Sequence, residues 1–433
     1  MAGLLRICTA GSVDDGKSTL IGRLLYDSRG VYEDQIRSVE AASKSRTAGP
    51  IDFSLFTDGL KAEREQGITI DVAYRYFATA RRKWILADTP GHEQYTRNMA
   101  TGASTADVAI LLVDARHGVR EQTRRHAAIA RMLGISSFVL AVNKMDLVDF
   151  DRGVFDATCA DFAGMLDGAA LHAIPLSALH GDNVITRSPR TPWFTGASLL
   201  EYLETVEIGR DAANAPFRLP VQLAVRPDDS FRGYAGQIAS GTIRPGDPIS
   251  VWPGGRTSKV KRIVSWEGDL EVAFAPMSVT LVLEHELDVS RGDLLATGAV
   301  DIANRFSAQM VWMDERALDP KRAYILKHAT RTLTAQVDAA LELNQIGTVT
   351  VSTSRVLAFD PYARNRTTGS FVLIDPATNF TAGAGMILRP LTEGVVHLPG
   401  REAADRLARA ARTAATHDEA VDAVRLMLEE ILS

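Results

Sequence analysis

Residues 11–18 read Gly11-Ser12-Val13-Asp14-Asp15-Gly16-Lys17-Ser18 and fit G-x-x-x-x-G-K-[ST], the pattern of a phosphate-binding loop. An apolar run precedes this stretch and predicts a buried strand, and the residues after it predict a helix. Backbone N–H groups of such a loop curl around phosphates, and the helix N-terminus adds positive potential. Lys17 can reach the β- and γ-phosphates, and the Ser18 hydroxyl can bind Mg²⁺. The predicted nucleotide-binding residues are Gly11, Ser12, Val13, Asp14, Asp15, Gly16, Lys17, Ser18 and Thr19.

A second motif, Asp88-Thr89-Pro90-Gly91-His92, follows the apolar strand predicted at 84–87. A carboxylate at that strand end can hold Mg²⁺ through water, and the Gly91 N–H can bond the γ-phosphate. His92 stands where a residue that orients the attacking water belongs, although a surface histidine at a helix start is the alternative. The polar stretch 27–61 is expected to be a long switch region that responds to the bound nucleotide, and it leads to the motif around Thr69. Thr69 is the expected switch ligand of Mg²⁺, through its hydroxyl or its carbonyl.

The third motif selects the base. Asn143-Lys144-Met145-Asp146 follows an apolar strand, and the Asp146 carboxylate accepts hydrogen bonds only. Guanine offers it two donors, whereas adenine offers none and would leave a charge unpaired. Ser177-Ala178-Leu179 is expected to close the base pocket with a backbone N–H to the guanine O6. The sequence therefore predicts GTP with Mg²⁺ as the ligand.

Composition narrows the class of protein. At 433 residues, of which 46% are hydrophobic, the chain is expected to form two or three domains. The net charge of −5 argues against nucleic acid as the main partner. No signal peptide or bilayer-length apolar run stands out, so we expect a cytoplasmic protein without membrane contact. A set of arginines around one predicted helix reads as a solvated face or as a partner surface: Arg116, Arg120, Arg124, Arg125 and Arg131.

Predicted elements change in character along the chain. Strands and helices alternate over 1–208, which predicts an α/β P-loop GTPase domain with a doubly wound, mostly parallel sheet. Short strands with Gly and Pro turns follow, the first of them expected at 219–225, and they predict two β-barrel domains, at 216–302 and 303–398. Residues 399–433 predict a short helical C-terminal tail, which either packs on its own barrel or docks another chain.

Five stretches of the sequence carry a family resemblance: residues 58–77, 92–104, 226–236, 311–313 and 369–386. They resemble the GTPase subunit of bacterial heterodimeric sulfate adenylyltransferase, a branch of the translation-factor GTPases. The resemblance covers roughly residues 4–390. One departure lies between Val337 and Leu343, where the family normally carries a longer stretch, so a strand or loop of the last domain is expected to be missing.

This resemblance implies a function that the motifs alone do not give. In the family, a smaller catalytic subunit makes adenosine 5′-phosphosulfate and pyrophosphate from ATP and sulfate, and GTP hydrolysis in the larger subunit drives that synthesis. It also implies that Val13 and Ile68 form an apolar gate beside the attacking water, with core packing as the alternative role. No second phosphate-binding loop is present, so we expect no fused adenylylsulfate kinase activity. The alternative function is an elongation factor that delivers aminoacyl-tRNA, because both share this nucleotide site.

Overall fold

The computed structural model describes residues 4–28, 37, 39, 51–56, 69–92, 95–165, 169–207, 213–228 and 231–391. The chain divides into two compact units, Met1–Arg210 and Asp211–Ser433, which are described separately below. The predicted gate residue Ile68, most of the predicted switch stretch 27–61, and the predicted helical tail lie outside the described residues.

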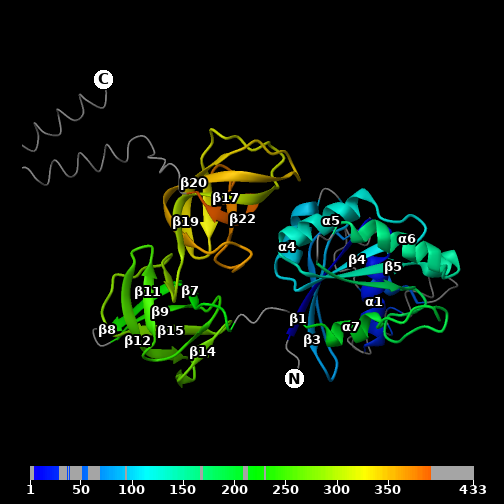
Figure 1. Ribbon diagram of the computed structural model, residues 1–433, viewed down its shortest axis with the longest axis horizontal. Helices are drawn as coiled ribbons and strands as arrows, with labels where there is room; N and C mark the ends of the chain where they lie inside the picture. The colour runs from blue at the N-terminus through cyan, green and yellow to red at the C-terminus, as the bar shows by residue number, and fades with distance from the viewer. Residues whose placement is uncertain are drawn as a thin grey trace, which may run out of the picture. The chain divides into compact units, whose positions relative to one another are not determined.

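The first unit is built on a six-stranded sheet in the order β2-β3-β1-β4-β5-β6 (Figure 1). The strands are β1 (Leu4–Gly11), β2 (Ala73–Ala78), β3 (Lys83–Asp88), β4 (Val108–Asp114), β5 (Ser137–Asn143) and β6 (Ala170–Pro175). Neighbouring strands are parallel except at one edge, where β2 runs antiparallel to β3. The mostly parallel, doubly wound sheet predicted from the sequence is confirmed.

Helices cover both faces of this sheet. They are α1 (Lys17–Asp27), α4 (Thr96–Ser104), α5 (Glu121–Met132), α6 (Arg152–Ala163) and α7 (Leu199–Thr205), with short 3₁₀ turns η1 (Phe53–Phe56) and η3 (Met145–Val148). In Figure 1, α4, α5 and α6 lie on one side of the sheet, and α1 and α7 lie on the other. Because both faces are covered, β4 is buried along its whole length and its sequence VAILLVD is almost entirely apolar.

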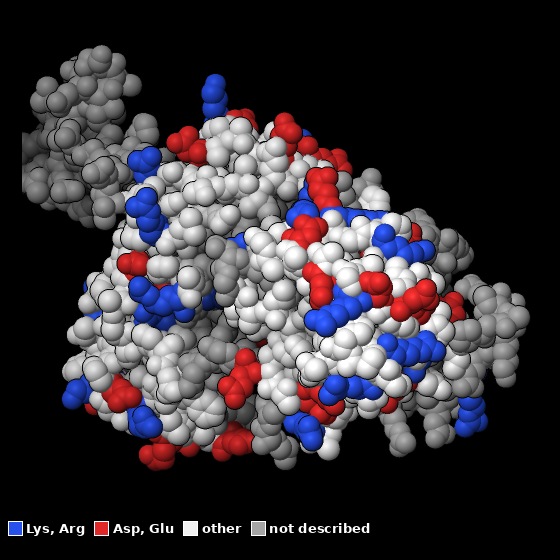
Figure 2. All heavy atoms as spheres, turned by 45° about the vertical axis from the view of Figure 1, so that its right-hand side comes forward, with Lys and Arg blue, Asp and Glu red and all other residues white. Residues whose placement is uncertain are grey.

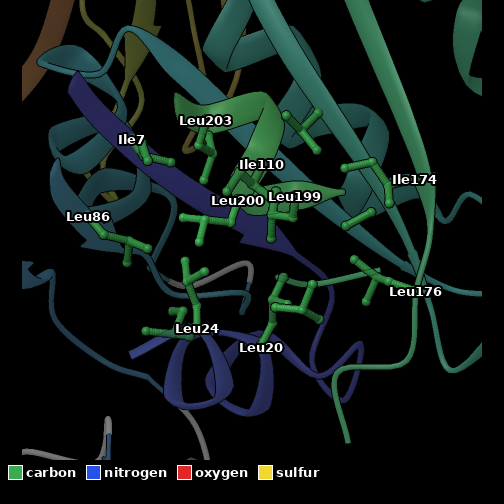
Figure 3. Packing of buried hydrophobic residues seen from close by; sticks show 14 of the residues in the cluster. Ile7, Leu20, Leu24, Leu86, Ile110, Ile174, Leu176, Leu199, Leu200 and Leu203 are labelled. Atoms are coloured by element: carbon green, nitrogen blue, oxygen red, sulfur yellow. The ribbon is translucent and has the colours of Figure 1, made fainter. Parts of the chain in front are cut away.

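The core under α1 and α7 fixes the strand ends that carry the motifs. Leu20 and Leu24 of α1 and Leu203 of α7 pack with Ile7 and Ile110 from the central strands (Figure 3). All five of these side chains are at least 98% buried. Since β1, β3 and β5 run parallel, their carboxyl ends meet at one edge of the sheet, where open α/β sheets bind ligands.

The second unit begins with an antiparallel sheet in the order β7-β16-β11-β12-β15-β9-β8, with β13 paired to β12 and a separate β10–β14 ladder. Its strands are β7 (Arg218–Pro220), β8 (Leu223–Asp228), β9 (Phe231–Gln237), β10 (Thr242–Ile243), β11 (Pro248–Trp252), β12 (Arg256–Ser265), β13 (Gly268–Asp269), β14 (Ala273–Phe274), β15 (Ser278–Leu283) and β16 (Leu294–Ala296). The single strand predicted at 219–225 is wrong. The chain there forms both β7 and β8, because β7 pairs with β16 whereas β8 pairs with β9.

A closed six-stranded barrel completes the described part of the second unit, in the order β17-β20-β19-β18-β21-β22. Its strands are β17 (Asp301–Trp312), β18 (Tyr324–His328), β19 (Arg331–Asp338), β20 (Ile346–Phe359), β21 (Ser370–Ile374) and β22 (Thr381–Pro390). The barrel is closed despite the short stretch after Val337, and β19 pairs with β20 from Ala335 to Asp338. The sheet and the barrel meet at Arg218, whose guanidinium bonds both carboxylate oxygens of Asp360 at 2.8 and 2.9 Å.

Candidate nucleotide-binding site

The predicted phosphate loop connects the end of β1 to the start of α1. Asp14 and Gly16 have φ angles of 68° and 91°, so the backbone turns through the left-handed region between strand and helix. A side chain at Gly16 would meet the Asn143 amide nitrogen as well. The loop therefore has the curled backbone that the motif predicts, and Ser18 and Thr19 lie half-buried in the first turn of α1.

Lys17 is folded back over the loop. Its ammonium donates to the carbonyl oxygens of Gly11 and Ser12, both at 2.9 Å. Burial lowers the pKa of Lys17, and the nearby carboxylates of Asp88 and Asp15 oppose that shift. Gly91 packs against the same ammonium, because a Cβ there would collide with Lys17 Nζ. The second motif therefore reaches the phosphate loop.

Two buried oxygens of the loop bear on whether an anion fits. The Asp15 carboxylate accepts from the Ser12 backbone N–H at 2.7 Å. Burial raises the pKa of Asp15, whereas this hydrogen bond and the charge of Lys17 act to lower it. Ser12 is only 5% exposed, and its hydroxyl finds no hydrogen-bond partner among the described residues. An orphaned hydroxyl beside a lysine ammonium and curled backbone suits a phosphate oxygen as acceptor.

Asp88 ends β3 directly beside the loop strand. The register pairs it with Thr9 of β1, whose hydroxyl lies 3.4 Å from the Asp88 carboxylate. Thr89 in turn donates its hydroxyl to the Thr9 carbonyl oxygen at 2.5 Å. All four residues from Asp88 to Gly91 are buried, so the motif is packed at the sheet edge.

The predicted switch residues Thr69 and His92 both precede α4 in the sequence. Asn98 of α4 donates to the Ile70 carbonyl oxygen at 2.7 Å and so fixes the backbone next to Thr69, which is half-buried. His92 is also half-buried, and its ring centroid lies 5.8 Å from that of Tyr95. Val13 is half-buried in the loop. Its predicted gate partner cannot be compared with it, since Ile68 is outside the described residues.

Asn143, at the end of β5, joins the phosphate loop to the base loop. Its amide donates to the Asp15 carbonyl oxygen at 2.8 Å, and its side-chain oxygen accepts from the Ala178 N–H at 2.9 Å. Met145 beside it is buried, and its N–H donates to the Leu176 carbonyl oxygen at 3.2 Å. Three segments distant in sequence are therefore fixed to one another through this asparagine.

Lys144 crosses the phosphate loop from the same turn. Its ammonium donates to the Asp14 carbonyl oxygen at 2.5 Å and pairs with Asp114 at 3.0 Å. Burial works against the charge on Asp114, but hydrogen bonds from Arg116 and Lys144 outweigh it and hold the pKa of that carboxyl well below its usual range. Asp114 therefore anchors Lys144 as a carboxylate.

Asp146, the predicted base reader, has a side chain that is 14% exposed and lies 3.7 Å from the His180 ring. His180 follows the predicted Ser177-Ala178-Leu179 loop, and its backbone N–H donates to the buried Ser177 hydroxyl at 3.3 Å. Leu179 is 41% exposed. The two predicted base motifs are thus neighbours in space, as a shared pocket requires.

Sequence reasoning did not select three residues that organise this site. Asp114 anchors Lys144, Asn98 fixes the backbone beside Thr69, and Arg23 of α1 contacts the base loop through the Leu179 carbonyl oxygen at 3.3 Å. A carboxylate directly after the apolar run 108–113 is a signal that could have found Asp114. Nothing in the sequence pattern marks Asn98 or Arg23.

The arginines around α5 are largely engaged with neighbours. Arg116 pairs with Asp114 at 2.7 Å, Arg124 with Asp161 at 2.6 Å, and Arg131 donates to the Met165 carbonyl oxygen at 2.7 Å. On the face drawn in Figure 2, basic and acidic side chains are interspersed rather than gathered by sign. Among the described helices, none is long and apolar enough to cross a membrane.

Comparison with known proteins adds family evidence to this geometry. Residues 3–208 match the family model described as Elongation factor Tu GTP binding domain, and residues 338–388 match GTP-eEF1A C-terminal domain-like. A solved structure, "Crystal Structure Analysis of sup35 complexed with GDP", covers 90% of this chain and 95% of that chain. Its TM-score of 0.40 and 23% identity are too low to carry an argument.

Curated relatives are much more similar. The Bifunctional enzyme CysN/CysC of Rhodopirellula baltica is 54% identical over 90% of this chain, which spans only 64% of that longer protein. Sulfate adenylyltransferase subunit 1 of Bacteroides thetaiotaomicron is 52% identical, over 89% of this chain and 86% of its own length. The protein of the same name from Tolumonas auensis is 51% identical, over 90% and 87%. With half of its residues shared over most of both chains, and an elongation factor Tu type GTP-binding domain, this chain belongs to the sulfate adenylyltransferase subunit 1 family.

Proposed function

We propose that this chain binds GTP with Mg²⁺, hydrolyses GTP, and thereby drives sulfate activation in a partner subunit. The observation that carries the nucleotide part is the double hydrogen bonding of Asn143, which ties the phosphate loop at Asp15 to the base loop at Ala178. With Asp146 three residues later, this arrangement supports a site that reads phosphate and guanine together. A carboxylate facing two guanine donors favours GTP over ATP.

The Mg²⁺ ligands would be the Ser18 hydroxyl, Thr69, and Asp88 through water. Hydroxyl and carboxylate oxygens are the ligands that this hard cation prefers, and the residues present fit it. When bound, Mg²⁺ neutralises charge on the β- and γ-phosphates. The Lys17 ammonium, which donates to the carbonyl oxygens of Gly11 and Ser12, would supply a second positive charge there.

Hydrolysis then depends on placing a water in line with the γ-phosphate. We assign this role to His92, directly after Gly91, whose backbone lies against Lys17. Val13, half-buried in the loop, would shield the path of that water together with Ile68. Since orienting a water matters mainly in the transition state, His92 should affect hydrolysis much more than binding.

The sulfate chemistry belongs to the partner in this proposal. The names of the relatives, sulfate adenylyltransferase subunit 1, support a second subunit. This sequence has one phosphate-binding loop of the G-x-x-x-x-G-K-[ST] type and no S-G-G-x-D-S-type pyrophosphatase loop. A smaller catalytic subunit would therefore bind ATP and sulfate and form adenosine 5′-phosphosulfate and pyrophosphate. The two subunits would work in the cytoplasm, without nucleic acid or membrane as partners.

Sulfate-dependent pyrophosphate release tests this division of labour. The chain and the adenylyltransferase subunit are co-purified, and release is measured for each alone and for the complex, with and without GTP. We expect release by the complex to rise with GTP and none by this chain alone. Release by the single chain would refute the division of labour, whereas a complex that ignores GTP would refute the coupling.

The competing function, delivery of aminoacyl-tRNA, rests on the match of residues 3–208 to the elongation factor Tu domain. The curated relatives at 51 and 52% identity instead favour a role in sulfate activation. A filter-binding titration with aminoacyl-tRNA in the presence of GTP separates the two. GTP-dependent binding at submicromolar concentration would favour the elongation factor.

A further inference from the structure

Arg23, in the middle of α1, contacts two parts of the first unit that are far apart in sequence. Its Nε pairs with Asp27 one turn later on the same helix, at 2.6 Å. One terminal nitrogen donates to the Leu179 carbonyl oxygen in the predicted base loop at 3.3 Å. Its guanidinium carbon also lies 5.0 Å from the centroid of the Phe53 ring. The side chain is only 22% exposed, so the three contacts hold it in one orientation.

The contact with the base loop is close. Gly181 has a φ of 84°, and a side chain at that position would collide with the Arg23 guanidinium. The backbone of the loop that carries Ala178 and Leu179 therefore rests on Arg23. Asn143 holds the same loop from the phosphate side, through the Ala178 N–H.

The contact with Phe53 belongs to a small aromatic cluster. Phe53 is 4% exposed, and its ring centroid lies 5.5 Å from that of Tyr26 and 6.4 Å from that of Phe56. Gly22 allows the approach, because a Cβ there would collide with the Phe53 backbone. Residues 51–56 are thus docked on α1. In the sequence they stand between the phosphate loop and Thr69, in the stretch predicted to respond to the nucleotide.

We propose that Arg23 is a positioning residue that couples occupancy of the guanine pocket to docking of Phe53 on α1. The inference rests on the proposed binding of guanine nucleotides. A planar guanidinium can bond Asp27 and Leu179 while its face meets an aromatic ring, whereas a lysine ammonium cannot make all three contacts at once. Closing the base loop on guanine orders Arg23 and favours docked Phe53. By reciprocity, docked Phe53 slows the release of nucleotide.

Release of a fluorescent GDP analogue, mant-GDP, from the full chain tests the coupling. We expect Arg23→Lys to accelerate dissociation about fivefold, the lower end of ordinary coupling between sites. Phe53→Leu should have a similar effect. The double variant should be no faster than the faster single variant, because both changes break one connection. Rates that multiply in the double variant would overturn the proposal.

A spectroscopic readout separates coupling from a merely structural role. The Phe53→Trp variant adds one tryptophan, and GDP should change its fluorescence more than it changes that of the wild-type chain. Adding Arg23→Lys to this variant should abolish the extra change, although GDP still binds. Gly181→Ala, which crowds the guanidinium from the base side, should do the same. The matched control is Gly118→Ala, which has the same left-handed strain at φ 66° and nothing within 4 Å of the new Cβ.

The outcomes distinguish this inference from the proposed function. If the wild-type chain fails to bind mant-GDP, the proposed function is wrong. If it binds, but the response of the Phe53→Trp variant persists in Arg23→Lys, only the coupling is wrong. Should Arg23→Lys unfold, the rates of mant-GDP release from Gly181→Ala and Gly118→Ala decide the question, since these two variants keep both Arg23 and Phe53.

Discussion

Asn143 donates its side-chain amide to the backbone carbonyl oxygen of Asp15 at 2.8 Å, across 128 residues of sequence. Because the same side chain accepts from Ala178, the asparagine closes a bridge between the phosphate loop and the base loop. Both bonds are buried, so their loss would leave polar backbone groups without partners in a place that water does not reach. This bridge fixes the phosphate loop and the base loop relative to each other.

The first prediction concerns this bridge. Asn143→Ala should lower the thermal midpoint and raise the Kd for GDP by on the order of tenfold, since a buried donor and a buried acceptor lose their partners. Isothermal titration and differential scanning fluorimetry measure the two effects. Gln237→Ala is the control, because it removes an amide-to-carbonyl bond of 3.1 Å at an exposed position. Equal effects of the two substitutions would contradict the bridging role.

Base selection gives the second prediction. Asp146→Asn should weaken GTP binding on the order of 10²-fold and gain affinity for xanthosine triphosphate, whose 2-oxo group accepts from the new amide. Competition titrations against mant-GDP measure both nucleotides. Asp149→Asn, an exposed change three residues away, should leave both affinities unchanged. A wild-type chain that binds ATP as tightly as GTP would rule out the assignment of Asp146.

The third prediction separates binding from hydrolysis. His92→Ala should keep the affinity for GTP and lower single-turnover hydrolysis on the order of 10²-fold, because positioning a water contributes in the transition state. Lys17→Ala should lose nucleotide altogether. His285→Ala, an exposed histidine of the second unit, serves as the control. Hydrolysis at the wild-type rate by His92→Ala, with the partner subunit present, would exclude the water-positioning role.

Local patterns were enough to predict the sheet of the first unit and the strand ends at which the motifs lie. The strand ends before Gly11, Asp88 and Asn143 follow from apolar runs bounded by polar motifs, and parallel pairing brings them to one edge. Arg23 could not be found in this way. Its partners Leu179 and Phe53 are contacted through a carbonyl oxygen and a ring face, so their separation in sequence carries no pattern.

The second unit shows a different limit of prediction from sequence. The run 219–225 has the composition of one strand, yet its two halves pair with different neighbours, β16 and β9. Pairing partners in an antiparallel sheet are set by contacts distant in sequence, and intrinsic strand preference does not encode them. The ion pair between Arg218 and Asp360 could not be predicted for the same reason, since the two residues are 142 positions apart in the sequence.

Acid sensitivity is the fourth prediction. Burial lowers the pKa of His126 to about 3, and the charges of Lys17 and Arg125 add to that shift. The folded state therefore keeps this ring neutral, whereas the unfolded chain takes up a proton below pH 6.5. Stability from this group is present above pH 6.5 and is lost as the pH falls toward 3, by about 1.4 kcal/mol per pH unit.

His126→Gln should remove this part of the acid loss. We expect a lower unfolding midpoint than wild type at pH 7, because the bond to Gln122 at 2.9 Å is changed, but a smaller drop between pH 7 and pH 5. His285→Gln should leave the drop as in wild type. Parallel pH profiles for wild type and His126→Gln would show that the ring does not titrate as its burial requires.

The last prediction concerns the buried ion pair of the second unit. Arg218 and Asp360 both have side chains that are 2% exposed, and Arg218 also donates to the carbonyl oxygens of Thr297 and Ala299, each at 2.6 Å. Thr368 donates its hydroxyl to Asp360 at 2.7 Å. Removing one charge leaves the other buried without compensation, so Arg218→Met should destabilise the second unit by about 3–5 kcal/mol.

Urea unfolding of the full chain measures this effect, and mant-GDP binding reports separately on the first unit, where we expect no change. The matched control is Arg262→Met, whose pair with Asp269 has similar geometry, at 2.7 and 3.0 Å, but side chains that are 48% and 51% exposed. Water solvates both Arg262 and Asp269, so loss of this exposed ion pair should not move the urea midpoint. A comparable shift in the two variants would mean that burial does not set the strength of the Arg218–Asp360 pair, and that the sheet and the barrel are held together by other contacts.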